Sequence, residues 1–253
     1  VSHEGLQRIH YKGGADVVAL YLRNTPKSKL FDGKSLILGG SHSPNYNLAG
    51  SLVGDLSAIL IENINPFANL VRVPAKKTAL LSDFEVKRDR IAQETLGKNI
   101  TNISGVPSWM LSVLVRIMEL SGKEHLEEVW PNLEVFFHGG IAFTPYRKQY
   151  EKLITKSDMH YMETYNASEG FFGIQDDPSD SSMLLMIDYD VFYEFIPMEE
   201  FGKDNATVVP LSGIELGRNY AMVITTACGL WRYVIGDTVS FTSRDPYKFV
   251  ITG

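Results

Sequence analysis

The sequence predicts an α/β fold in which helices flank β-sheets and the C-terminal half forms a β-rich meander or barrel. Two observations lead to this fold class. Helix signals are concentrated in residues 1–157, whereas residues 158–253 contain short strand-like segments separated by Asp, Gly, Pro and Ser clusters. A hydrophobic share of 44% is typical of a chain with a packed core. We therefore expect an α/β part and a β-rich part that meet near residue 157.

The helix expected at residues 82–97 has signals at both ends. Ser82 and Glu85 have the spacing of a capping box, and Gly97 is a suitable C-terminal stop. Residues 106–120 are the most apolar helical stretch. This stretch is shorter than the roughly 20 residues that span a bilayer and it contains an arginine, so we expect a buried core helix and no membrane segment.

Two more helices and one strand are expected in the first part. Thr144 is suited to cap a helix that has Pro145 in its first position. Residues 48–61 are expected to be helical as well. The apolar run LEVFF at 133–137 predicts a strand.

Six short strands are expected in the second part. They are SMLLMIDYD, VFYEFIP, NYAMVITT, LWRYVIGD, TVSFT and YKFVIT. Because they follow one another closely, they favour an antiparallel meander or barrel.

The charge and the cysteine content exclude several classes of protein. The formal net charge of -6 argues against a nucleic-acid-binding face built from the whole molecule. The single cysteine, Cys228, cannot form an intrachain disulfide, so a cytoplasmic location is expected. The six histidines show no zinc-ligand spacing, and GxSxG is absent, so neither a zinc site nor a serine hydrolase is expected.

Two segments contain residue types suited to a nucleotide. LEVFFHGG places Gly139 and Gly140 at the end of a strand, where glycines let the backbone approach a ligand; a tight turn is the other interpretation. In YNASEGFFG, Tyr165 suits a purine, Ser168 suits a phosphate or a ring nitrogen, and Glu169 suits Mg²⁺. The alternative for this second segment is an ordinary loop in which Ser168 caps the backbone.

A third segment, GLWRYVIGDTV, has a charged residue near each end of an apolar strand. Arg232 and Asp237 are either edge charges, with Gly236 as a turn, or the strand delivers Asp237 to a ligand. Strand geometry alone favours the interpretation as edge charges.

The three segments, in this order, resemble those of the adenylate-forming enzymes, the superfamily of luciferase and the acyl-CoA synthetases. YNASEGFFG, VFYEFIP and ELGRNYAMVITTACGLWRYVIGDTV are similar to motifs of the auxin-responsive Gretchen Hagen family of acyl-acid amido synthetases. The resemblance covers most of the chain and is strongest after residue 133. It implies the large-domain portion of an adenylate-forming enzyme of a bacterial type.

The resemblance also implies a reaction. ATP and a small carboxylic acid would form an acyl-adenylate, with Mg²⁺ at the phosphates, and the amine of an amino acid would then displace AMP to give an amide. Neither a nucleic acid nor a membrane is an expected partner. No protein nucleophile is needed, because the substrate carboxylate attacks the α-phosphate and the protein supplies positioning and charge stabilisation.

The family's site residues carry over to matching positions of this sequence. Tyr165 would stack on or border the adenine, with Ser168 beside the nucleotide. Glu169 would be the catalytic residue that coordinates Mg²⁺, and Asp237 would accept hydrogen bonds from the ribose hydroxyls. The glycine pair at 139–140 would form the backbone edge of the adenine and acyl pocket.

The chain departs from the family pattern in two respects. Arg232 matches the family arginine and is interpreted as structural support, but Val234 stands where a second arginine is frequent. The phosphate-binding loop is expected upstream of residue 1 and the C-terminal lid domain after VITG at 250–253. We therefore expect a chain truncated at both ends that shows little ATP–pyrophosphate exchange alone.

Several alternatives stay open at this point. An acyl-CoA ligase shares the adenylation step, and a non-catalytic nucleotide- or ligand-binding module on the same fold would keep the pockets. A β-rich carbohydrate-binding protein is a further possibility. The acyl acid is not identified: residues 37–50 and 141–143 are candidates for the pocket wall, and His42 is interpreted as hydrogen-bonded structure more readily than as a substrate contact.

Overall fold

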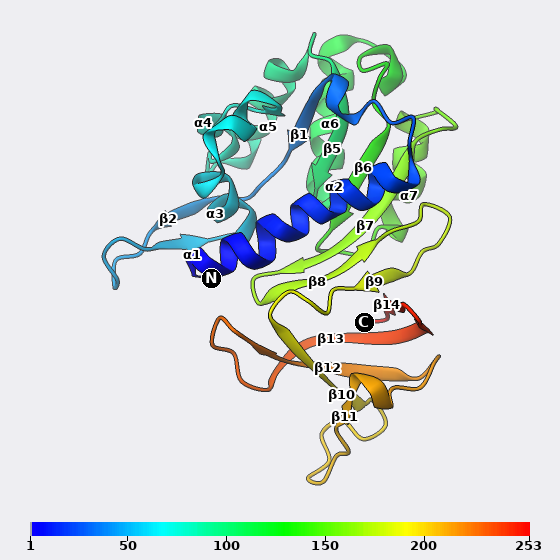
Figure 1. Cartoon of the computed structure of the whole chain (residues 1–253). Coiled ribbons are helices and arrows are strands. Elements are labelled where there is room, and N and C mark those ends of the chain that lie inside the picture. Colours follow the sequence, from blue (N-terminus) through cyan, green and yellow to red (C-terminus); the bar gives the residue numbers. More distant parts are fainter. Residues whose placement is uncertain (1) are drawn as a thin grey trace. The chain divides into compact units, whose positions relative to one another are not determined.

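The computed structural model describes residues 2–253, which form two compact units with separate cores (Figure 1). The parallel-sheet unit comprises Pro26–Met162. The antiparallel-sheet unit combines residues 2–25 with Glu163–Gly253. The N-terminal helical segment therefore belongs with the β-rich part of the chain, although the sequence groups it with the α/β part.

The parallel-sheet unit contains four parallel strands in the order β6–β5–β1–β4. The strands are β1 Lys34–Ile37, β4 Arg72–Val73, β5 Ile100–Gly105 and β6 Val135–Gly139. Its α-helices are α3 Leu56–Asn63, α4 Lys76–Ala79, α5 Phe84–Thr95, α6 Pro107–Ser121 and α7 Thr144–Leu153. Its 3₁₀-helices are η2 Leu30–Asp32, η3 Pro66–Leu70 and η4 Leu126–Glu128, and its hairpin pairs β2 His42–Pro44 with β3 Leu52–Gly54.

One hydrophobic core joins the helices of this unit to its sheet. Ile91 of α5, Leu114 of α6 and Tyr150 of α7 all contact the cluster that contains Ile103 and Phe136 of the central strands. The expected core helix at 106–120 is confirmed, because α6 buries its apolar side in this cluster. Among residues 2–253, no helix is long and apolar enough to cross a membrane.

Two helix starts differ from the sequence prediction by one residue. Asp83, not Ser82, caps α5, and its carboxylate accepts the backbone N–H of Val86 at 3.0 Å. Thr144 is the first residue of α7 and makes no side-chain cap, because the cap position belongs to Phe143. Neighbouring Ser, Thr and Asp residues have similar capping ability, so the sequence does not rank them.

The helix expected at 48–61 is wrong over its first half. Helix α3 begins only at Leu56, after the β2–β3 hairpin. Gly50 and Gly54 have φ of +78° and +156°, which a right-handed helix does not contain. These glycines therefore end the hairpin turn and separate it from the helix.

The antiparallel-sheet unit begins with a helical segment and continues with eight strands. The helical segment is α1 His3–Gly5, the π-helix η1 Leu6–Tyr11 and α2 Lys12–Asn24; η5 Leu211–Gly213 is a short 3₁₀-helix. The strands are β7 His160–Ala167, whose first three residues belong to the other unit, β8 Gly170–Gln175, β9 Met183–Leu185, β10 Val191–Pro197, β11 Val209–Pro210, β12 Asn219–Thr226, β13 Tyr233–Arg244 and β14 Tyr247–Ile251.

The strands of this unit form two meanders. Strands β7–β8–β9 and β12–β13–β14 each pair in chain order, and β14 pairs with β9 to join them; β10 and β11 follow β12 at the other side. All these neighbours are antiparallel, so the expected meander is confirmed. Its core includes Tyr165, Phe172, Tyr193, Phe241 and Phe249.

Three segments from the sequence analysis take a different form in this sheet. LWRYVIGD and TVSFT are parts of a single strand, β13, which begins at Tyr233, so Trp231 and Arg232 precede it. The segment YNASEGFFG is a β-hairpin, not an irregular loop: β7 and β8 are joined by the two-residue turn Ser168–Glu169.

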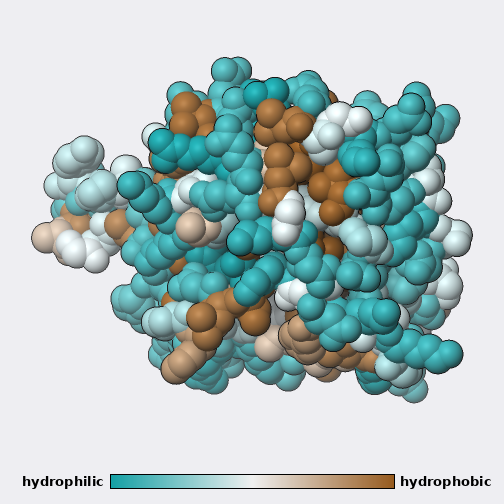
Figure 2. All heavy atoms as spheres, turned by 90° about the horizontal axis from the view of Figure 1, so that it is seen from above, coloured by the Kyte–Doolittle hydropathy of each residue, from teal (hydrophilic) through white to brown (hydrophobic). Residues whose placement is uncertain are grey.

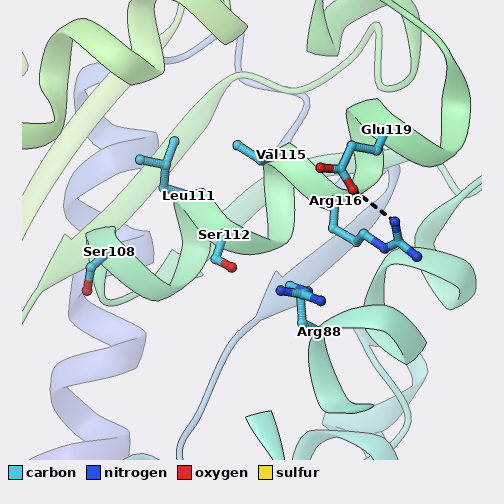
Figure 3. A pocket seen from close by; sticks show the side chains of 7 residues that line it. All are labelled: Arg88, Ser108, Leu111, Ser112, Val115, Arg116 and Glu119. Atoms are coloured by element: carbon cyan, nitrogen blue, oxygen red, sulfur yellow. Dashed lines mark hydrogen bonds and ion pairs between the residues drawn. The ribbon is translucent and has the colours of Figure 1, made fainter. Parts of the chain in front are cut away.

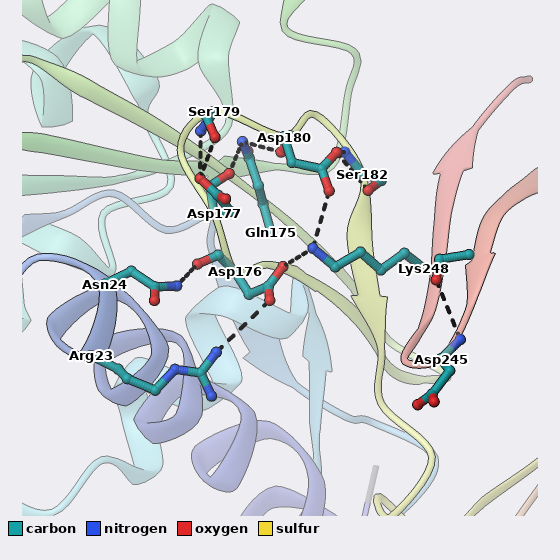
Figure 4. Close-up of polar contacts among 11 residues, drawn as sticks. Arg23, Asn24, Gln175, Asp176, Asp177, Ser179, Asp180, Ser182, Asp245 and Lys248 are labelled. Carbon is teal, nitrogen blue, oxygen red and sulfur yellow. Dashed lines mark hydrogen bonds and ion pairs between the residues drawn. The ribbon is translucent and has the colours of Figure 1, made fainter.

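A polar network ties the loop between β8 and β9 to β14 and to α2 (Figure 4). The ammonium of Lys248 lies 2.7 Å from the carboxylate of Asp176 and 3.0 Å from that of Asp180. Arg23 lies 3.8 Å from Asp176 on the other side. The hydroxyl and backbone N–H of Ser182 donate to Asp180, and these bonds, with Lys248, lower the pKa of Asp180 to about 2.

This network predicts acid-sensitive stability. The folded-state pKa of Asp180 lies below its ordinary value of 3.8. The ionised carboxylate therefore stabilises the folded state above about pH 4, and this stabilisation is lost as the pH falls towards 2. We expect Asp180→Asn to lower stability at pH 5, by less than about 1 kcal/mol because the pair is partly exposed, with the difference vanishing near pH 2. Urea unfolding at several pH values measures it.

The exposed Asp204→Asn variant serves as the control, since Asp204 makes no hydrogen bond or ion pair with residues 2–253. A pH-independent difference between Asp180→Asn and the unsubstituted chain would contradict the expectation.

Candidate functional site

A hydrogen bond joins two of the predicted nucleotide-binding residues. The hydroxyl of Tyr165 on β7 donates to the carboxylate of Asp237 on β13. Three strands lie between β7 and β13 in the sheet, which corresponds to roughly 19 Å along a flat sheet. The two side chains meet only because the antiparallel sheet curls around its core. The site therefore depends on the curvature of this sheet.

A bulge in β13 places Asp237. Ala221 pairs with Thr238 and Val223 pairs with Val234, so residues 235–237 lie opposite Met222 alone. Gly236, within the bulge, has φ of +101°, a conformation that favours glycine. Bulges bend a strand and turn its side chains in a new direction, which accounts for the contact of Asp237 with Tyr165.

The ring of Tyr165 is buried, with 6% of the residue exposed. It packs edge to face against Phe172 at 5.0 Å between ring centroids and lies 6.3 Å from Phe249. Burial raises the pKa of Tyr165 well above its ordinary value, and the hydrogen bond to Asp237 and the nearby charge of Glu169 raise it further. The phenol is therefore protonated at neutral pH and acts as the donor.

Ser168 and Glu169 form the turn of the β7–β8 hairpin beside this pair. Ser168 is exposed and Glu169 is half-buried. Neither side chain makes a hydrogen bond or ion pair with residues 2–253, although the charge of Glu169 acts on Tyr165. Glu169 is thus a carboxylate close to the Tyr165–Asp237 pair and available to a ligand.

The side chains near Tyr165 and Asp237 fit Mg²⁺ only if phosphates and water supply most of its ligands. Within residues 2–253, no group of three or more His, Cys, Asp or Glu side chains is arranged to hold a metal ion. Mg²⁺ in nucleotide sites is commonly bound through one or two carboxylates, with phosphates and water as the other ligands. Glu169 fits that arrangement, and a metal held by protein ligands alone does not fit.

Arg232 lies in the loop before β13. Its φ is +45°, its Nε lies 3.0 Å from Oε2 of Glu194, and its backbone N–H donates to the hydroxyl of Thr225. These contacts connect the loop to β10 and β12. Val234, where the family frequently has an arginine, is partly exposed in the same sheet.

The predicted glycine pair lies in the parallel-sheet unit. Gly139 ends β6, and Gly140, which follows it, is exposed and has φ of +83°. A Cβ at Gly140 would lie 3.4 Å from the side chain of Val106, which follows β5. The pair therefore lies at the carboxyl edge of the parallel strands, the edge at which α/β proteins bind ligands.

Further glycines occupy the same edge: Gly39 and Gly40, which lie in the candidate pocket wall at 37–50, and Gly105, which the sequence did not single out. Gly39 and Gly40 follow β1, and Gly105 ends β5, where a Cβ would lie 3.1 Å from Leu38. The ammonium of buried Lys87 donates to the carbonyls of Gly39 and Gly40 at 3.1 and 2.8 Å. Burial lowers the pKa of Lys87. The available signal was a glycine directly after the short runs KSLIL and ITNIS, which were not predicted as strands.

His138 precedes the glycine pair and is buried in β6. Its ring stacks on Phe143 with centroids 4.3 Å apart. The guanidinium of Arg147 lies over the rings of Phe143 and Tyr161. Burial, with a smaller effect of Arg147, lowers the pKa of His138 to about 3. The imidazole is therefore neutral at physiological pH.

His42 and most of the candidate pocket wall at 37–50 lie in the β2–β3 hairpin, whereas residues 141–143 of the wall lie between β6 and α7. The Nε2 atom of His42 lies 3.4 Å from Glu62, which also pairs with Lys76 at 2.7 Å. This contact agrees with the interpretation of His42 as hydrogen-bonded structure. Tyr46, at the turn of the hairpin, is 94% exposed.

An open hollow of about 400 Å³ lies between α5 and α6 and contains none of the predicted site residues (Figure 3). Its charged lining is already paired, since Arg116 lies 2.8 Å from Glu119 and 3.1 Å from Asp89. The face seen in Figure 2 is mainly hydrophilic with separate apolar areas. The hollow therefore has the character of a surface groove between two helices.

The structure brings together Tyr165, Asp237 and Glu169, with Ser168 in the same turn. Gly139 and Gly140 belong to the other unit and are described within it.

Most of this chain matches models of a known protein family. The sequence matches the GH3 family N-terminal domain over residues 4–159 and the GH3 family central domain over residues 184–252. The first match alone covers more than half of the 253 residues.

Curated relatives share parts of the sequence. The chain is 31% identical over 137 residues to the indole-3-acetic acid-amido synthetase GH3.3 of Arabidopsis thaliana, a match that covers 49% of this chain and 22% of that protein. It is 41% identical over 83 residues to the probable indole-3-acetic acid-amido synthetase GH3.9 of Oryza sativa subsp. japonica, which covers 31% of this chain and 18% of that protein.

Solved structures share the fold. AtGH3.15 acyl acid amido synthetase in complex with 2,4-DB has a TM-score of 0.77 at 19% identity, and the match covers 100% of this chain and 52% of that chain. A 2-hydroxyisobutyryl-CoA ligase has a TM-score of 0.55 at 13% identity, with 94% and 48% covered. The predicted fold class, an α/β fold like that of the large domain of adenylate-forming enzymes, is confirmed. The chain spans about half the length of these structures.

The bulge in β13 provides a test of the local geometry. We expect Gly236→Ala to lower the free energy of unfolding by about 1–2 kcal/mol, because a Cβ is disfavoured at φ of +101° although no atom lies within 4 Å of it. Gly14→Ala, in α2 and equally free of neighbours, should raise it by about 0.5–1 kcal/mol. Urea unfolding distinguishes the opposite signs, and a shared sign would contradict the strain at Gly236.

Proposed function

This chain belongs to the GH3 family, and we propose that it contributes the nucleotide-binding part of an acyl acid amido synthetase. The proposed reaction has two steps. The carboxylate of an acyl acid attacks the α-phosphate of ATP to form an acyl-adenylate and pyrophosphate. The amine of an amino acid then attacks the acyl carbon, the bond from that carbon to the phosphate oxygen breaks, and AMP leaves.

The contact between Tyr165 and Asp237, with Glu169 beside it, is the observation that supports this proposal most directly. Tyr165 and Asp237 lie 72 residues apart along the chain and meet in the fold. Adenylation needs placed charges and hydrogen-bonding groups more than a protein nucleophile. A carboxylate held by a phenol and a second carboxylate on an adjacent turn are such a set.

We assign roles to these residues within the proposal. Asp237 accepts hydrogen bonds from the ribose hydroxyls, and Tyr165 borders the nucleoside. Ser168 lies beside the nucleotide, and Glu169 holds Mg²⁺, which supplies charge neutralisation at the ATP phosphates when bound. Arg232, through Glu194, supports the loop before β13.

Within the parallel-sheet unit, we propose a role for the glycine pair at 139–140. Gly139 and Gly140 would present backbone groups to the adenine and acyl moieties, because they lie at the carboxyl edge of the parallel strands. Lys87 keeps the neighbouring Gly39 and Gly40 carbonyls in place. A cytoplasmic location, expected from the single cysteine, completes the proposal.

ATP–pyrophosphate exchange with a panel of carboxylic acids tests this function. The chain spans about half the length of its solved relatives, so exchange is measured with this chain and with a chimera in which it replaces the matching segment of a full-length GH3 amido synthetase. From the chimera, we expect exchange that depends on the carboxylic acid.

The products are then analysed with amino acids and with CoA as acceptors. A thioester product would favour an acyl-CoA ligase, and a folded chimera without exchange would contradict the adenylation step.

The role of Glu169 gives a second test in the same chimera. We expect Glu169→Gln to reduce the Mg²⁺-dependent exchange rate roughly 10- to 100-fold, the range found for groups that support bound metals. Glu85→Gln, an exposed glutamate on α5, is the matched control and should leave the rate unchanged. Equal exchange rates for Glu169→Gln and Glu85→Gln would contradict the assignment of Glu169 as a Mg²⁺ ligand.

A further inference from the structure

Tyr165 combines an immobile ring with a functional hydroxyl. Phe172 and Phe249, which are fully buried, pack around the ring, so little of its surface is left for a base. The hydroxyl emerges from this core and donates to Oδ2 of Asp237. A rigid ring gives that hydrogen bond a fixed origin.

Asp237 has no other side-chain partner among residues 2–253. Its carboxylate uses one oxygen for Tyr165, and a carboxylate has about four acceptor positions on two oxygens. Oδ1 is therefore available to accept hydrogen bonds from a ligand. Because Asp237 is half-buried, the number of directions from which a ligand reaches it is limited.

The backbone on either side of Asp237 is fixed separately. Thr238 donates its N–H to the carbonyl of Gly253 at 2.7 Å and accepts the N–H of Thr252 at 2.8 Å. Val234, before the bulge, pairs with Val223. These contacts restrain the main chain but leave the side-chain torsions of Asp237 free. Among the described residues, only Tyr165 restrains the carboxylate itself.

We propose that Tyr165 is a positioning residue whose hydroxyl orients the Asp237 carboxylate so that its second oxygen receives the ribose diol. The inference rests on the proposed function, because it takes the ribose as the ligand of Asp237. It assigns the role of Tyr165 to its hydroxyl, whereas stacking on adenine would use its ring. The two roles respond differently to Tyr165→Phe, which keeps the ring and removes the hydroxyl.

A comparison of ATP with 2′,3′-dideoxy-ATP measures the contribution of the diol. Dissociation constants for both nucleotides are determined by calorimetry with this chain and its variants. The unsubstituted chain should prefer ATP by about tenfold or more, since a hydrogen bond to a charged group is lost with the diol. The Tyr165→Phe variant should show a preference at least about threefold smaller, because the carboxylate must then be ordered on binding.

Tyr193→Phe is the matched control. Tyr193 is a buried tyrosine of the same core, and its hydroxyl donates to the carbonyl of Met186 at 2.9 Å and not to a carboxylate. Its removal should leave the preference for ATP unchanged. The preference is a ratio of two constants from one sample, so a partly unfolded variant still gives a valid result.

The outcomes separate the inference from the proposed function. The positioning role is supported if the preference for ATP over 2′,3′-dideoxy-ATP falls in Tyr165→Phe but not in Tyr193→Phe. An unchanged preference in Tyr165→Phe overturns the positioning role while leaving Asp237 as the ribose ligand. An equal fall of the preference in both tyrosine variants also overturns the positioning role. If the unsubstituted chain binds neither nucleotide, or binds both equally, the ribose assignment of Asp237 fails and the inference fails with it.

Discussion

The hydrogen bond from Tyr165 to Asp237 requires the antiparallel sheet to curl, and this curvature is the constraint on which the candidate site depends. Strands β7 and β13 are not neighbours, so their side chains meet only across the core that the sheet encloses. That core is built largely of aromatic residues, such as Phe172, Phe241 and Phe249, whose tilted and edge-to-face contacts fill the curved interior. The residues that hold the sheet together are therefore the same residues that orient the site.

Glycines at strand ends and within one strand complement this aromatic core. Gly236 permits the bulge that turns Asp237 inwards, and the bulge is effective because the strand on either side of it stays paired. In the parallel-sheet unit, Gly140 leaves the backbone exposed at the carboxyl edge of the strands, next to half-buried Gly139. The protein thus uses large side chains where a group must be held still and glycines where the chain must bend or remain accessible.

Local patterns predicted much of the fold, whereas contacts between distant residues were beyond them. VFYEFIP and NYAMVITT coincide with β10 and β12, and the apolar run at 106–120 became α6, because period and turn residues are local signals. The residues of the site were chosen by motif. Their contact was not predicted, since it depends on the curl of the sheet. The hairpin at residues 42–54 was missed because the positive φ of Gly50 and Gly54 is a property of the folded backbone.

The surroundings of Tyr165 give its ring and its hydroxyl different roles. A tyrosine that stacks on a base must expose a face of its ring, but this ring lies among buried aromatic side chains, with 6% of the residue exposed. A tyrosine that orients a carboxylate needs only its hydroxyl at the edge of the core, and the hydroxyl is the part of Tyr165 that meets Asp237. Burial also keeps the phenol protonated, so that it remains a donor to the carboxylate at neutral pH. The same burial that removes the ring from the ligand therefore makes the hydroxyl suitable for positioning Asp237.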